Sequence, residues 1–197
     1  MAKITYTSKA DNVTTELPEI NKVTAANMNE VKASVNAVYD TLGGFAVYAD
    51  TATAIAPIPL SSGVWVDLTN DKLGANTLDT YKPSYVAGDL WNTATNSIKF
   101  SELGVGKALL VRNDFSVTTG SANTRLDARL YFPDTGKIVE FSHDNIATNG
   151  SNIRYSRSTL IYTTTETLTS GCKIQVKCDK SGSTLVVEDI VISVLSF

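Results

Sequence analysis

The stretch "CKIQVKCDKSGSTLVVEDIVISVLSF", residues 172–197, sets the fold class of this 197-residue chain. In its first half, Ile174, Val176 and Cys178 alternate with polar side chains, which is the two-residue period of a half-buried strand. The Ser-Gly pair at 181–182 then marks a turn into a second strand. The segment therefore predicts two strands of an antiparallel sheet.

The last strand is apolar on both faces. One face carries Ile190, Ile192 and Val194, and the other carries Val191, Leu195 and Phe197. Because one face of each sheet in a single sandwich meets water, the second apolar face requires a cover. We expect a neighbouring copy to supply it, so that Val191, Leu195 and Phe197 line an interface between copies; a loop such as residues 71–100 folding over the face is the alternative. Trp65, which points away from Val64 and Val66, has the same two alternatives.

Similar strand-like segments recur upstream. "GVWVDLTN" and "TRLDARLYF" both alternate apolar and polar side chains, and turn signals such as "PDTG" at 133–136 and Asn149–Gly150 separate the segments. About eight to ten short strands with little helical pattern indicate an antiparallel β-sandwich. We therefore predict a mainly β protein with a jelly roll over residues 44–197.

A single helix is predicted over residues 24–43, ending at Gly43–Gly44. Its apolar residues follow heptad spacing over two heptads: Met28, Val31, Val35, Val38 and Leu42. This stripe is narrower than the face of a helix that docks on its own domain, and valine at both core positions favours trimers over dimers. We expect these five residues to form a short trimeric coiled coil; docking on the chain's own domain is the alternative.

Residues 1–23 are polar and aperiodic, with Pro18 interrupting them, so we expect an extended arm that orders only against another protein. The start lacks the apolar core of a secretory signal, and no apolar run approaches the roughly 20 residues that span a bilayer. Net charge is −3 and the 17 basic residues are scattered. A protein that folds in a cytoplasm, without nucleic-acid binding or membrane insertion, is expected.

Few residues indicate chemistry. On one strand, Cys172 and Cys178 would lie about 20 Å apart, too far for a disulfide, so buried free thiols are expected. The single histidine, His143, is expected to be structural or solvated in a loop. "GVGK" at 104–107 is too short for a phosphate-binding loop and predicts a turn. We expect no catalytic residues, no metal and no cofactor, although a carboxylate pair is not excluded by sequence.

The segment "YKPSYVAGDLW" concentrates three aromatic residues in a loop-like region: Tyr81, Tyr85 and Trp91. Aromatic side chains on sandwich loops can stack on sugars or dock a protein partner, and they also pack onto their own sandwich. These three residues are therefore candidates for binding a ligand, either a glycan or a protein partner, and packing onto their own sandwich is the alternative.

The stretch "LPEINKVTAANMNEVKASVNAVYDTLGG", residues 17–44, resembles the fibre and head-fibre proteins of tailed bacteriophages, including those of the crAss-like group. Over residues 45–197 the resemblance is architectural only, to the trimeric jelly rolls of the tumour-necrosis-factor and complement-C1q type. The resemblance implies a homotrimer attached to capsid or other virion proteins through residues 1–23, with Leu17, Pro18 and Ile20 as the anchor. The strand from Asp189 to Phe197 would line the trimer interior.

The sequence and the resemblance together predict a non-enzymatic virion protein, a head fibre or capsid decoration that presents its sandwich outward, with adhesion to a host or surface glycan as its task. A tail-borne receptor-binding protein, a carbohydrate-binding module and a glycan-degrading β-sandwich enzyme are the alternatives.

Overall fold

The computed structural model describes residues 25–195, and for residues 38–41 and 170 it describes the backbone alone. The predicted anchor residues Leu17, Pro18 and Ile20, and also Phe197, lie outside the described residues. The chain divides between Leu42 and Gly43 into two compact units. Within the first unit, α1 (Ala25–Thr41) forms one continuous helix.

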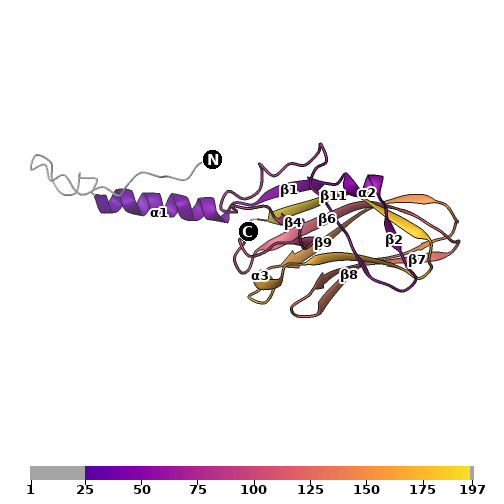
Figure 1. Cartoon of the computed structure of the whole chain (residues 1–197). Helices are drawn as coiled ribbons and strands as arrows, with labels where there is room; N and C mark the ends of the chain where they lie inside the picture. The colour runs from indigo at the N-terminus through magenta and orange to yellow at the C-terminus, as the bar shows by residue number, and fades with distance from the viewer. Residues whose placement is uncertain (1–24, 196–197) are drawn as a thin grey trace, which may run out of the picture. The chain divides into compact units, whose positions relative to one another are not determined.

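The second unit contains two antiparallel sheets, which Figure 1 shows as two layers. Sheet A has the strand order β1 (Gly44–Ala49), β11 (Ser183–Leu195), β6 (Ala108–Thr118) and β9 (Asn152–Tyr162), and β2 (Ile58–Leu60) also pairs with β11. Sheet B has the order β3 (Val66–Asp67), β10 (Lys173–Cys178), β7 (Thr124–Phe132) and β8 (Lys137–Ile146). The remaining elements are short: α2 (Ala52–Ile55), α3 (Thr167–Ser170) and the hairpin of β4 (Trp91–Asn92) with β5 (Ser97–Ile98).

This strand order is that of a jelly roll. Along the chain the path crosses from β3 in sheet B to β6 in sheet A and back to β7 and β8, and then alternates sheets through β9, β10 and β11. Each sheet therefore pairs strands that are distant in sequence, such as β1 with β11. The prediction of a mainly β, antiparallel protein is confirmed.

The core lies between the sheets. β11 contributes Ile190, Ile192 and Val194, which are at most 3% exposed, as the alternation predicted. Cys172 and Cys178 are buried free thiols, which confirms that prediction, and burial raises the pKa of both.

The predicted turns are present. In the turn between β7 and β8, the amide of Gly136 donates to the carbonyl of Phe132 at 2.9 Å, and Gly136 has a φ of 68°, which favours glycine. Residues 104–107 form the predicted turn that leads into β6.

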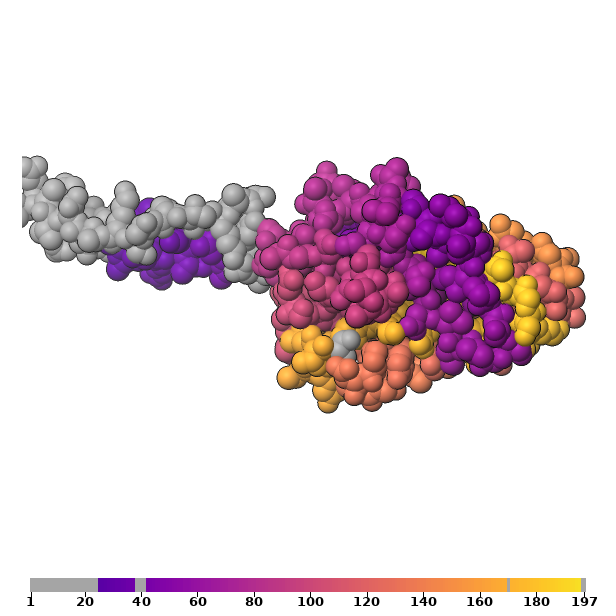
Figure 2. Space-filling model, in the orientation of Figure 1, coloured from indigo at the N-terminus to yellow at the C-terminus, as the bar shows by residue number. Residues whose placement is uncertain are grey.

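The long segment between β3 and β6 lies along the free edge of β1. The amides of Phe45 and Val47 donate to the carbonyls of Tyr81 and Leu78, both at 2.8 Å. A Cβ on Gly44 would lie 2.4 Å from the Tyr81 carbonyl oxygen, so glycine permits this approach. The segment also adds core side chains, including Leu90 and Phe100. Its violet-to-magenta residues form much of the surface seen in Figure 2. The backbone hydrogen bonds thus place residues 78–81 beside β1, at the edge of sheet A.

Candidate assembly face

Strand register identifies which residues share the outer face of sheet A, the face turned away from the core. One row across the sheet runs from Phe45 on β1 through Ser193 and Leu110 to Leu160 on β9. A neighbouring row joins Leu195, Ala108 and Tyr162. A third row starts with Val47, Val191 and Arg112. We call this surface the assembly face; its apolar part comprises Phe45, Val47, Leu110, Leu160, Tyr162, Val191 and Leu195.

The apolar part of the assembly face is open to solvent in the single chain. Phe45, Leu110, Leu160 and Tyr162 are between 39% and 58% exposed, and Val191 and Leu195 are half-buried. The segment along β1 shields only that edge, where the Tyr81 ring stacks on Phe45 with centroids 5.5 Å apart. Because contiguous apolar side chains on a surface mark interaction sites, this face is the leading candidate for a functional surface.

A charged border adjoins these apolar rows. Arg112 Nε donates to Asp114 Oδ2 at 3.0 Å, and Arg154 forms an ion pair with Glu188. Asp189 lies opposite Asp114 in the strand register. The assembly face therefore has an apolar part and a charged border.

The outer face of sheet B is different in character. Its rows place Lys177, Asp127 and His143 side by side, and beside them Gln175, Arg129 and Glu140. These polar groups largely satisfy each other: for example, Arg129 Nε donates to Gln175 Oε1 at 2.8 Å. A network of paired charges of this kind can stay exposed to solvent, so the outer faces of sheets A and B differ in chemical character.

Asp127 is the centre of this network of paired charges on sheet B. Its carboxylate lies 2.8 Å from Arg125 Nε, 2.8 Å from His143 Nδ1 and 3.2 Å from Lys177 Nζ. Burial acts to raise the pKa of Asp127, but the hydrogen bonds from His143, Arg125 and Lys177 outweigh it and hold the pKa below its usual range. His143 lies on β8, which corrects the prediction that it belongs to a loop; the strand extends because its backbone pairs with Asp127.

Trp65 is contacted by cationic side chains of its own chain and stays partly exposed. Arg129 Cζ lies 4.0 Å from the centroid of its ring and Lys177 Nζ 4.6 Å, so two cations of the same chain contact the indole. β7 and β10 thus cover part of the Trp65 ring, a contribution that the two expected alternatives, a neighbouring copy and residues 71–100, did not include.

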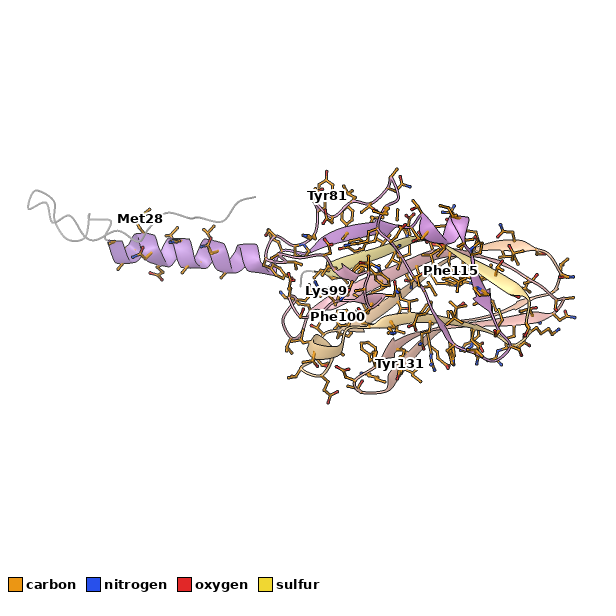
Figure 3. All side chains as sticks on the ribbon, viewed as in Figure 1. Met28, Tyr81, Lys99, Phe100, Phe115 and Tyr131 are labelled. Atoms are coloured by element: carbon orange, nitrogen blue, oxygen red, sulfur yellow. The ribbon has the colours of Figure 1, made fainter. Side chains whose placement is uncertain are left out.

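The three aromatic residues considered for ligand binding do not share a surface. Trp91 is 1% exposed, and its Nε1 donates to the carbonyl of Asn70 at 3.0 Å, so its ring belongs to the core. Tyr85 packs partly buried against the core, whereas Tyr81 is 60% exposed (Figure 3). Of the three, Tyr81 alone offers a ring that a ligand can reach.

An open polar pocket of about 640 Å³ lies beside the β4–β5 hairpin and α3, where Lys99 and Phe100 contribute to its wall (Figure 3). Among the described residues that line it, Asp67 supplies the one carboxylate, and that group already bonds to Lys173 Nζ and to Gln175 Nε2. Glycoside hydrolysis generally requires two carboxylates, which this lining does not provide. Within residues 25–195, no group of three His, Cys, Asp or Glu side chains is placed to hold a metal ion.

The helix carries a second candidate surface. Met28, Val31 and Val35 on α1, and Leu42 directly after its last residue Thr41, are between 43% and 54% exposed, and Figure 3 shows Met28 on α1. The side chain of Val38 lies outside the described residues. These exposed side chains are accessible for contact with another helix. The coiled coil itself stays a prediction.

No family model matches the sequence, and no curated protein matches it. Among solved structures, the Eiger TNF of S. frugiperda is similar at a TM-score of 0.46 and 10% identity, over 77% of this chain and 92% of that one. PRD1 vertex protein P5 is similar at 0.39 and 16% identity, over 78% and 73%. A structure of infectious bursal disease virus (Gx strain) is similar at 0.38 and 12% identity, over 79% and 32%. The jelly-roll assignment rests on the strand order of this chain.

The sequence prediction found the β11 part of the assembly face but missed Leu110, Leu160 and Tyr162. A signal for them existed. Residues 108–111 and 160–162 are short continuous apolar runs, so each strand is apolar on both faces there, as β11 is. What the sequence did not reveal is that these two strands lie together with β11 in one sheet.

Proposed function

We propose that this protein is a homotrimeric structural protein of a bacteriophage virion, a head fibre or capsid decoration without enzymatic activity. The observation that carries the proposal is the apolar part of the assembly face, which the single chain leaves exposed. No helix among residues 25–195 is long and apolar enough to cross a membrane.

The residues of the assembly face favour further copies of the same chain as its binding partners. The helix stripe and the sheet face are both apolar, and in a symmetric oligomer every copy brings both. Valine at both heptad positions favours three helices. Three copies about one axis close a ring, so that each assembly face is covered and none remains to drive further association.

The virion location is supported by the resemblance of residues 17–44 to phage head fibres. In this proposal residues 1–23 bind a capsid or other virion protein, and the sandwich points outward. The paired charges on the outer face of sheet B suit an exposed surface. Weak adhesion to a host glycan, multiplied by three copies in each fibre, is the task we assign to it.

Mass measurement tests the trimer. Sedimentation equilibrium of the full chain is expected to give three times the monomer mass at micromolar concentration, and a stable monomer would refute the proposal. A chain without residues 1–44 should keep part of its self-association through the sheet but fail to join the particle.

Two further measurements separate the alternatives. Electron microscopy of a virion carrying the protein distinguishes a head fibre from a tail-borne receptor-binding protein. A reducing-sugar assay with host capsule polysaccharide tests for glycan degradation; activity that disappears on replacement of one carboxylate would overturn the non-enzymatic assignment.

A further inference from the structure

Two carboxylates lie opposite each other on the assembly face. Asp114 of β6 and Asp189 of β11 are register partners, and both alternate with the core residues Phe115 and Ile190, so both point outward. Their next outward neighbour on β11 is Val191, which belongs to the apolar part of the face. Like charges directly opposite in a sheet destabilise it, so this pair is unfavourable unless something neutralises it.

The two nearby arginines are each paired with a carboxylate other than Asp189. Arg112 binds Asp114, with Nε and Nη2 both 3.0 Å from Oδ2, and Arg154 on β9 binds Glu188. Asp189 has no ion pair among the described residues. Arg112 and Arg154 thus oppose three carboxylates on this part of the face, which leaves one excess negative charge.

Asp114 adds a second observation. Its side chain is 6% exposed, and its Oδ1 is buried with no hydrogen-bond donor among the described residues. A carboxylate oxygen without a donor can accept a hydrogen bond from a neighbouring carboxyl group when that group is protonated. A proton on Asp189 would therefore remove the excess charge and supply the donor that Oδ1 lacks.

We infer that Asp189 and Asp114 form a proton-sharing pair and that association through the assembly face takes up one proton per chain from solvent. This inference rests on the proposed trimer. Asp189 takes up the proton and donates a hydrogen bond to Oδ1 of Asp114, whose Oδ2 stays bound to Arg112, and no other bond changes.

The direction of the pH dependence follows from burial. In the single chain, burial and then the charge of Asp114 raise the pKa of Asp189, while Arg112 and Arg154 act to lower it. A neighbouring copy that covers the face removes more water and raises this pKa further. The trimer therefore binds more protons than three separate chains, so association strengthens as pH falls, and this proton-linked contribution is lost as pH rises through the raised pKa.

The strands around Asp189 contribute several charged groups. β6 contributes Arg112 and Asp114, β9 contributes Arg154, and β11 contributes Glu188. Beyond β1, Asp50 accepts hydrogen bonds from Thr53 and from the amide of Asp71, so its carboxylate is turned to these donors. A partner's arginine placed against Asp189 would give the opposite pH dependence.

Sedimentation of the full chain between pH 5 and pH 8 tests the inference. If each chain takes up one proton, the trimer association constant is expected to rise by up to about 1,000-fold for each pH unit by which the pH falls. This dependence holds between the pKa of Asp189 in the separate chain and its higher pKa in the trimer. Asp189→Asn, a neutral isostere, should give a trimer as tight at pH 8 as the wild type is at its acid limit, with little dependence on pH. Asp134→Asn on the exposed β7–β8 turn is the control for loss of one charge and should behave as wild type.

The outcomes separate the two proposals. A trimer whose association constant is flat with pH, or falls as pH is lowered, would overturn the proton-sharing pair and leave the trimer intact. A chain that is monomeric at every pH would overturn the proposed function itself. The wild-type measurement decides between these results even if Asp189→Asn does not fold.

Discussion

Leu160 offers the sharpest test of the assembly face. It lies on β9, its side chain is 46% exposed in the single chain, and it shares a row with Leu110 and Phe45. Leu160→Ala removes most of this apolar surface without adding charge or altering the backbone. If the face is covered in a trimer, the substitution weakens association.

The size of the effect follows from the exposed fraction. Full burial of a leucine side chain contributes about 1.5–3 kcal/mol, so covering the 46% that remains exposed contributes about 0.7–1.4 kcal/mol per chain. Three copies give about 2–4 kcal/mol per trimer, which corresponds to a decrease of about 30- to 1,000-fold in the trimer association constant. Adding Leu110→Ala to the same chain should increase the loss, because its side chain is 39% exposed in the same row.

Sedimentation velocity over a concentration series measures the change, and the chain provides a matched control. Ile138 is 45% exposed on β8, on the outer face of sheet B, so Ile138→Ala removes a similar apolar surface from the other side of the sandwich. It should leave association unchanged. Equal association constants for wild type and Leu160→Ala, or equal losses for Leu160→Ala and Ile138→Ala, would refute the assignment of the interface to sheet A.

Three further predictions concern the sandwich itself. Burial acts to raise the pKa of Asp71, but hydrogen bonds from Thr51 Oγ1 and from backbone amides lower it to about 2. A lowered pKa stabilises the fold fully only at pH values above the pKa of an ordinary aspartate. Asp71→Asn should therefore lower the free energy of unfolding in urea by about 1 kcal/mol at pH 7, and by progressively less as pH falls toward 2. Gly44→Ala should lower the free energy of unfolding by about 1–3 kcal/mol, since the added Cβ would lie 2.4 Å from the carbonyl oxygen of Tyr81; an unchanged urea midpoint would contradict this close approach. Finally, Cys172 and Cys178 should resist a thiol reagent in the native protein and both react once it is unfolded, and rapid native labelling would show that residues 172–178 are less buried than the structure indicates.

Much of the local structure could be predicted from neighbouring residues. The two-residue alternation of 173–178 and the glycine-containing turn at 133–136 depend on contacts a few residues apart, so a linear reading is sufficient for them. The same holds for the buried cysteines. His143 was misplaced because "FSHDN" carries turn-forming residues, whereas pairing with β7 keeps it in a strand.

The sequence by itself determined the fold class, the helix and the presence of an unusual apolar face on the last strand. Only the tertiary structure decided that β6 and β9 extend that face, that two cations of the same chain contact the Trp65 ring, and that residues 78–81 lie along an edge of sheet A. The physical reason is register: a jelly roll pairs strands that are far apart in the chain, and a shift of one residue would send every side chain to the opposite face. The two-residue alternation in the sequence assigns side chains to the two faces of a strand, whereas the partner strands decide what each face packs against.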